Sequence, residues 1–188
     1  MRLFTAIDLP AETLLRLERL LSALRPEALI KWSPLDNLHI TTKFIGEWPE
    51  SRINDLDAAL AGLTARDAFE VELRNIGWFP NERSPRVLWA GVHAGPALRQ
   101  LMTDTEQRLM TLGIAKDEKP ATPHLTLARI KTPVPLRNLR LKVEELQPAE
   151  IGKFSARNFN LFRSDPGSNA SIYRRLRDYR FENALAAP

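Results

Sequence analysis

Two stretches of this sequence share one pattern: residues 37–45 read NLHITTKFI, and residues 123–130 read PHLTLARI. Both stretches are rich in β-branched and aliphatic residues, so each predicts a β-strand. Each also carries a histidine, His39 in the first and His124 in the second, followed two positions later by a threonine. The chain has three histidines, so two of the three lie in the same short motif.

The spacing of the motif has a structural meaning. Side chains alternate between the two faces of a strand, so each histidine shares a face with its threonine, Thr41 or Thr126. The intervening residues, Ile40 and Leu125, then point to the opposite face and serve as aliphatic anchors. If the two strands face each other, two imidazoles and two hydroxyls converge on one site.

The motifs lie about half the chain apart, which suggests two similar lobes. Elsewhere the pattern predicts strands and helices in alternating groups, which favours an α+β architecture with antiparallel sheets. We expect one bilobal domain over residues 1–188, with two pseudo-symmetric lobes, helices packed outside the sheets and an active-site cleft between the lobes. The strands are predicted at 2–7, 38–45, 69–79, 87–93, 124–130, 154–163 and 171–181, and the helices at 11–25, 50–64, 96–112 and 136–146. A turn sequence, SDPGSN at 164–169, joins the last two strands.

Composition limits the classes of protein to consider. The chain has 188 residues, 44% of them hydrophobic, a net charge of +4 and no cysteine. A packed core is therefore possible, and disulfides and cysteine-based zinc sites are excluded. No apolar run approaches the roughly 20 residues needed to span a membrane, and the N-terminus does not look like a signal peptide. We expect a cytoplasmic monomer without membrane contacts.

Two histidines and two threonines suit metal-free chemistry on a phosphodiester. Imidazole has an unperturbed pKa near 6.5, so one copy can act as base while the other acts as acid. Threonine hydroxyls can donate hydrogen bonds to phosphate oxygens. The alternatives are structural histidines, which is how we interpret His93, and a metal site. The sequence contains no H-E-x-x-H motif and no acidic residue at a matching position, so we expect neither a metal nor another cofactor.

Further side chains near the motifs are weaker candidates. Lys43 lies four residues after His39, so by strand alternation it shares the face of His39. It is a possible phosphate contact, or else the solvated end of a strand. Arg129 lies five residues after His124, so strand alternation places it on the opposite face. It reaches the substrate only if the strand ends or bulges there. The arginines at 174, 175, 177 and 180 either line an RNA path or form a solvated face. The tryptophans at 32, 78 and 89 are assigned to the core.

The ordered set of motifs resembles the 2H phosphoesterase superfamily, and within it the RNA 2',3'-cyclic phosphodiesterases, also called 2'-5' RNA ligases. The resemblance covers nearly the whole chain. It rests on RLFTAIDLP at 2–10, NLHITTKFIGE at 37–47, PRVLWAGV at 85–92 and PHLTLAR at 123–129.

The resemblance implies a substrate and separate roles for the site residues. It implies hydrolysis of a ribose 2',3'-cyclic phosphate on RNA ends or nucleotides to a 2'-phosphate, without metal. His39 corresponds to the proton donor and His124 to the proton acceptor. Thr41 and Thr126 would bind the phosphate, and the arginine of His-x-Thr-x-x-Arg, Arg129, is a substrate contact in similar proteins.

Three questions remain open from the sequence. The family often has a second aromatic residue in its first strand where this chain has Thr5, so the base preference is open. The same histidine pair supports 2'-5' ligation of ends like those of tRNA halves, the reverse reaction, although water at about 55 M favours hydrolysis by mass action. A non-catalytic nucleotide- or RNA-binding module would also use such a cleft.

Overall fold

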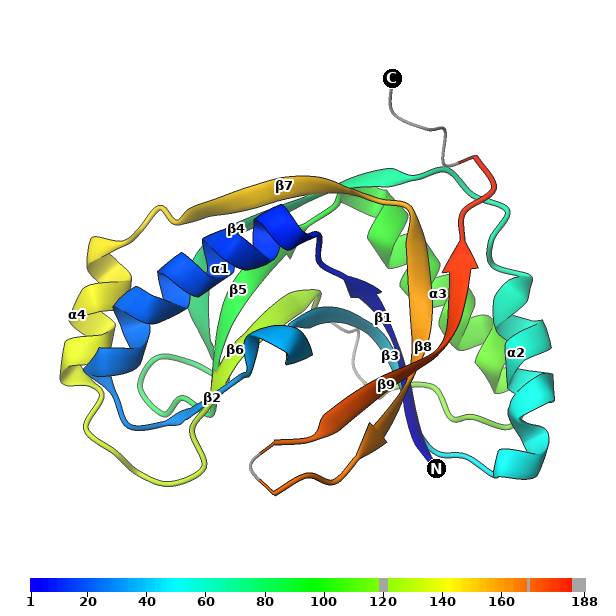
Figure 1. Ribbon diagram of the computed structural model, residues 1–188, viewed down its shortest axis with the longest axis horizontal. Helices are drawn as coiled ribbons and strands as arrows, with labels where there is room; N and C mark the ends of the chain where they lie inside the picture. Colours follow the sequence, from blue (N-terminus) through cyan, green and yellow to red (C-terminus); the bar gives the residue numbers. More distant parts are fainter. Residues whose placement is uncertain (119–121, 169, 184–188) are drawn as a thin grey trace.

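The computed structural model describes residues 1–118, 122–168 and 170–183. It contains two antiparallel sheets with helices packed outside them (Figure 1). The first sheet has the strand order β3 (His39–Glu47), β1 (Arg2–Asp8), β8 (Asn158–Asp165), β9 (Ile172–Arg180). The second has the order β2 (Lys31–Trp32), β6 (His124–Arg129), β5 (Val87–His93), β4 (Phe69–Phe79), β7 (Glu150–Ala156). The expected α+β class with two antiparallel lobes is confirmed.

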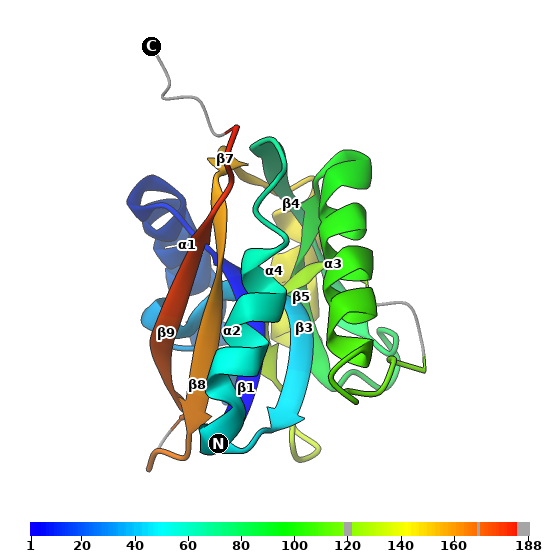
Figure 2. The same ribbon diagram turned by 90° about the vertical axis from the view of Figure 1, so that its right-hand side faces the viewer.

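Each sheet receives helices from both halves of the chain. The helices are α1 (Ala11–Leu24), α2 (Ile53–Ala61), α3 (Gly95–Met110) and α4 (Arg137–Glu145), and short 3-10 turns cover Arg25–Glu27, Leu35–Asn37 and Glu50–Arg52. Helix α1 follows a strand of the first sheet but packs against β7 of the second, whereas α3 follows a strand of the second sheet and packs against β3 of the first (Figure 2). The two lobes are therefore interlocked.

The helices form where the apolar spacing predicts them. In α1, Leu17, Leu21 and Leu24 recur along one face and are fully buried, and Pro26 follows the end of the helix. Gly113 follows α3 at a φ of 87°, a conformation that glycine adopts without steric cost.

One expected strand is wrong. The sequence predicts a single strand over 154–163, but the chain leaves the second sheet at Ala156 and enters the first at Asn158. The hairpin between β8 and β9 forms as predicted, although residue 169 of its predicted turn lies outside the described residues.

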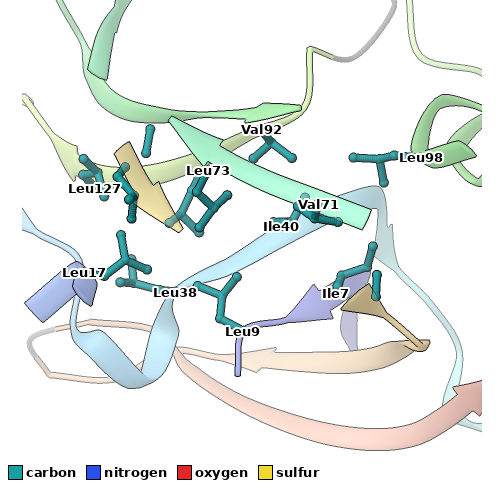
Figure 3. Close-up of a cluster of buried hydrophobic side chains, with 14 of the residues drawn as sticks. Ile7, Leu9, Leu17, Leu38, Ile40, Val71, Leu73, Val92, Leu98 and Leu127 are labelled. Carbon is teal, nitrogen blue, oxygen red and sulfur yellow. The ribbon is translucent and has the colours of Figure 1, made fainter. Parts of the chain in front are cut away.

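The aliphatic residue inside each motif enters the core. Ile40 and Leu125 are both fully buried in a continuous hydrophobic cluster that includes residues from both sheets. Figure 3 shows Ile40 among Ile7, Val71 and Val92. Because these anchors fix one face of each strand, the histidine and threonine are directed to the other face. No helix in the described part of the chain is both long enough and apolar enough to cross a membrane.

Candidate active site

His39 is the first residue of β3 and directly follows a 3-10 turn. Its Nδ1 lies 2.8 Å from the carbonyl oxygen of Asn37. A carbonyl oxygen can only accept, so in the neutral ring Nδ1 carries the hydrogen and Nε2 keeps the lone pair. Nε2 lies 3.0 Å from Oγ1 of Thr41, which donates its hydroxyl hydrogen to it in this tautomer. The backbone thus leaves Nε2 as the nitrogen that can exchange a proton with a ligand.

His124 opens β6 and is anchored in the same way. Its Nδ1 lies 2.8 Å from the carbonyl oxygen of Thr122, again two residues earlier in the chain. Its Nε2 is therefore also the nitrogen with the free lone pair in the neutral ring. Within the described residues, the hydroxyl of Thr126 makes no hydrogen bond to protein, so it can donate to a ligand.

The two motifs come together although they belong to different sheets. Strand β3 of the first sheet contacts β6 of the second. The charge of Arg129, and that of His124 when its ring is protonated, lower the pKa of His39, which places both side chains within electrostatic reach of its ring. The structure therefore brings His39, His124 and Arg129 into one site, with Thr41 and Thr126 beside the two histidines.

The surroundings of His39 disfavour its charged form. Burial of the ring is the largest cause and lowers the pKa to about 4, against the opposing hydrogen bond to Asn37. Arg129, and His124 when its ring is protonated, lower the pKa further by repulsion. His39 is therefore neutral at pH 7 in the ligand-free protein, and an anion bound beside it would favour its protonated form.

A β-bulge follows the threonine of each motif. In the first sheet, Thr5 pairs with Lys43 and Ala6 with Thr41, so Thr42 is an extra residue on β3. In the second sheet, Leu88 pairs with Ala128 and Trp89 with Thr126, so Leu127 is the extra residue on β6. A bulge reverses the alternation of side chains beyond it. Counting alternate residues from each histidine therefore gives the wrong face for side chains beyond Thr41 and Thr126.

The bulge in β6 returns Arg129 to the face of the histidines. Leu127 and Ala128 are both fully buried, whereas Arg129 is exposed and close enough to His39 to lower its pKa. The sequence required a bulge or a strand end for Arg129 to reach this face, and β6 has the bulge.

The bulge in β3 has the opposite consequence for Lys43. The placement of Lys43 on the histidine face is wrong, because its side chain is 2% exposed and enters the interior. Its Nζ lies 3.1 Å from a carboxylate oxygen of Glu106 in α3 and 2.8 Å from one of Asp117. Lys43 is thus an ion-pair partner for the segment that leads toward His124.

Aromatic side chains line the site beside both histidines. The rings of Phe4 and Tyr173 lie 4.8 and 5.2 Å from the ring of His39. The ring of Phe79 lies 5.1 Å from that of His124 and stacks on Trp89 at 4.9 Å. Of these residues the sequence assigns a place only to Trp89, and the core assignment is wrong, because its ring lies on the site face.

The alternation of Trp89 with buried residues is a local signal that it does not face the core. Trp89 is the strand partner of Thr126, and it alternates with the buried residues Leu88 and Ala90. A Cβ on Gly77 would lie 2.2 Å from the Trp89 ring, so the indole lies flat across the glycine of the neighbouring strand. Recognising this arrangement requires the pairing of β4 with β5, which the sequence does not supply.

Thr5 does not face this site. It is fully buried, and its hydroxyl is 2.7 Å from that of Thr42, the bulge residue. The aromatic residue of β1 that does face the site is Phe4, which also stacks on Phe162 at 5.3 Å. Thr5 is therefore not a site residue in this structure, and the base preference stays open.

The arginines of β9 are largely paired with carboxylates. Arg175 pairs with Asp8, Arg177 lies 3.3 Å from Asp57, and Arg174 lies 3.6 Å from Asp165. This favours a solvated face over an RNA path. His93 ends β5 and belongs to neither motif, and its Nε2 lies 3.2 Å from where a Cβ on Gly91, the strand partner of His124, would be. In the part of the chain that is described, no cluster of three His, Asp or Glu side chains has the arrangement of a metal site.

Comparison with known proteins places this geometry in a family. A family model described as LigT like Phosphoesterase matches residues 7–89 and 92–173. A Methanocaldococcus jannaschii protein named RNA 2',3'-cyclic phosphodiesterase is 30% identical over 182 residues, covering 95% of this chain and all of that protein. A Thermus thermophilus protein of the same name is 39% identical over 141 residues, covering 72% of this chain and 71% of that protein.

Solved structures show the same two-lobed fold. A crystal structure of a Thermus thermophilus protein superposes with a TM-score of 0.84 at 30% identity, covering 99% of this chain and all of that one. A crystal structure of Escherichia coli LigT complexed with 3'-AMP superposes with a TM-score of 0.77 at 27% identity, covering 96% of this chain and 98% of that one.

Proposed function

Because this chain belongs to the LigT-like phosphoesterase family, we propose that it is an RNA 2',3'-cyclic phosphodiesterase that opens the cyclic phosphate to a 2'-phosphate by metal-independent two-histidine catalysis. The observation that carries the proposal is the matched anchoring of His39 and His124. Both rings are held through Nδ1 by a backbone carbonyl, which leaves Nε2 of each for proton transfer. The name of several relatives, RNA 2',3'-cyclic phosphodiesterase, supports the choice of substrate.

The proposed reaction needs one base and one acid. Nε2 of His124 takes a proton from water, and the water oxygen attacks phosphorus. The bond between phosphorus and the 3' oxygen breaks, and Nε2 of His39 gives its proton to that oxygen. The product carries a 2'-phosphate and a free 3'-hydroxyl, and one water molecule is consumed.

The threonines and Arg129 would stabilise the charge on the phosphate. The hydroxyls of Thr41 and Thr126 lie on the same faces as the histidines and can donate to non-bridging oxygens. Arg129 adds a positive charge that no described carboxylate within ion-pair distance neutralises. Binding of 3'-AMP by E. coli LigT supports a site of this fold that accepts a nucleotide phosphate.

His39 can act as the acid only if the bound substrate raises its pKa. The pKa of His39 is about 4 in the ligand-free protein, so the ring lacks the proton that an acid must donate at pH 7. The negative charge of the bound cyclic phosphate opposes the repulsion from Arg129 and raises this pKa. Substrate binding would therefore coincide with proton uptake by His39.

The test is hydrolysis of 2',3'-cyclic AMP with analysis of the product. We expect 2'-AMP, an undiminished rate in EDTA and a bell-shaped dependence of kcat on pH. Strict dependence on added metal, or 3'-AMP as the main product, would contradict the mechanism. Tight binding without turnover would instead identify a nucleotide-binding module.

Ligation is tested with the same protein and tRNA halves that end in a 2',3'-cyclic phosphate and a 5'-hydroxyl. We expect the hydrolysed end to predominate over joined tRNA, because water competes with the incoming hydroxyl. Joined product in excess would favour the ligase. The monomeric state and cytoplasmic location stay predictions from the sequence.

A further inference from the structure

The edge strand β2 places a second cation beside Arg129. Lys31 of β2 is the direct strand partner of Arg129 in β6. Directly paired residues of antiparallel strands have their side chains on the same face of the sheet. The next pair, Trp32 with Ala128, points the other way, because Ala128 is fully buried and Trp32 packs against the core. Lys31 therefore projects on the face that carries Arg129 and the histidines.

Strand β2 is short, but it is fixed to the strand of the His124 motif. The backbone N–H of Ser33 donates to the carbonyl of Leu127 at 2.9 Å, and its hydroxyl donates to the carbonyl of Thr126 at 2.8 Å. The indole N–H of Trp32 donates to the carbonyl of Ala28 at 3.2 Å. The position of Lys31 relative to Thr126 and Arg129 is thus set by hydrogen bonds on both sides of it.

The charges on this part of the sheet are not balanced. The three neighbouring strands β2, β6 and β5 contain no Asp or Glu. Lys31 and Arg129 are both exposed, and among the residues that the structure describes neither has a carboxylate within ion-pair distance. The arginines of β9, by contrast, are mostly paired with acids. Two adjacent unpaired cations suit a polyanion.

The chemistry of the substrate tells which anion this is. A 2',3'-cyclic phosphate closes the 3' end of an RNA strand, so every further phosphate of the strand lies on its 5' side. Neighbouring strands of a sheet lie about 4.8 Å apart, so Lys31 lies directly beside Arg129, which is on the same strand as His124.

Resting on the proposed function, we propose that Lys31 binds the phosphodiester 5' of the terminal nucleotide. The protein thereby selects RNA ends over cyclic mononucleotides. Arg129 lies beside Lys31 and its charge reaches His39, so one face of the sheet would bind two successive phosphates. Lys31 is a specificity-determining residue in this arrangement and takes no part in proton transfer.

The experiment compares three substrates. These are 2',3'-cyclic AMP, the dinucleotide ApA with a 2',3'-cyclic end, and the same dinucleotide with a neutral methylphosphonate in place of its internal phosphodiester. We expect the charged dinucleotide to have a kcat/KM about tenfold higher than either of the others, the size of one charge-assisted contact. The neutral dinucleotide separates the effect of the phosphate charge from stacking of the added base on the aromatic residues of the site.

The matched variants are Lys31→Ala, Lys31→Arg and Lys153→Ala. Lys153 lies on β7, the opposite edge strand of the same sheet, and pairs with Glu72 at 3.3 Å. Lys31→Ala should lose the roughly tenfold preference and its dependence on salt while cyclic AMP hydrolysis changes by less than about twofold. Lys31→Arg should keep the preference, and Lys153→Ala should behave as the wild type.

The outcomes separate the two proposals. Hydrolysis of all three substrates at equal rates overturns the role of Lys31 and leaves the phosphodiesterase intact. A preference that persists in Lys31→Ala, or with the neutral linkage, also overturns it and assigns the effect to another contact. Failure of the wild type on every substrate overturns both proposals.

Discussion

His39 and His124 are held by the same backbone device but lie in different surroundings. In both, a carbonyl two residues earlier accepts a hydrogen bond from Nδ1 at 2.8 Å. The ring of His39, however, contacts Phe4 and Tyr173 and receives a hydrogen bond from Thr41, and its burial lowers its pKa to about 4. The backbone therefore sets which nitrogen is left free to exchange a proton, and the environment sets the affinity of that nitrogen for a proton.

The strands differ again beyond their bulges. Counting from each histidine, Lys43 corresponds to Ala128 and Phe44 to Arg129. The first pair is buried, and the second pair returns to the histidine face. The same backbone geometry thus gives one lobe an aromatic side chain and the other a cation at the equivalent place. Repetition of a motif does not imply repetition of its charges.

Removing either histidine should have the largest effect. His39→Ala and His124→Ala should each reduce kcat by roughly a hundredfold to ten-thousandfold, because each removes one proton-transfer step. The measurement is steady-state hydrolysis of 2',3'-cyclic AMP, with circular dichroism to check the fold. His93→Ala removes the histidine that belongs to neither motif and should retain activity. Equal, near-wild-type rates in both motif variants would show that the motifs only bind.

Substitutions of Lys43 and Arg129 should affect different properties, the first mainly stability and the second mainly activity. Lys43→Met should lower the free energy of unfolding by about 2–3 kcal/mol, less than for a fully buried ion pair because Asp117 is half exposed. Arg129→Ala should leave stability nearly unchanged and lower kcat/KM about tenfold, through loss of a charge-assisted contact. Urea unfolding and kinetics of both variants test this. The reverse result would mean that Lys43, and not Arg129, contacts the substrate.

Burial of His39 should make stability depend on pH. The folded state disfavours the proton that the unfolded chain binds below a pKa of about 6.5, so stability is full above pH 6.5 and falls as the pH decreases toward 4. Between pH 7 and pH 5 this one group should cost about 2 kcal/mol. The wild type should lose that much more than His39→Gln in urea unfolding at the two pH values. Identical losses would show that burial of His39 does not control the effect.

Substitution of either threonine should reduce activity about as little as substitution of Arg129, and the two variants should differ in the pKa of His39. Thr41→Val and Thr126→Val should each lower kcat about tenfold by removing a donor to the phosphate. Thr41→Val should in addition raise the pKa of His39, because the hydroxyl that donates to its neutral Nε2 is lost. Titration of the His39 ring by NMR in the ligand-free variants measures this. A shift of equal size in Thr126→Val would contradict the local origin of the effect.

Local patterns were sufficient for the helices and the class of fold. The leucines of α1 recur at helical spacing and are buried as that spacing predicts. The division of residues 150–165 between two sheets could not be predicted from local patterns. The chain changes sheets at Arg157, with neither glycine nor proline nearby to mark the change, because the exchange depends on which strands are available as partners.

The sequence by itself determined the two His-x-Thr motifs, the face that each His–Thr pair shares and the aliphatic anchor behind it, because alternation along a strand is a local property. Tertiary structure decided the direction of the side chains beyond each threonine. A bulge is an extra residue relative to a partner strand, so it exists only once β1 pairs with β3 and β5 with β6. That pairing turned Lys43 inward and Arg129 outward, and the pairing of β2 with β6 placed Lys31 beside Arg129. The low proton affinity of His39 is likewise tertiary, since it arises from burial and from charges carried by the other sheet.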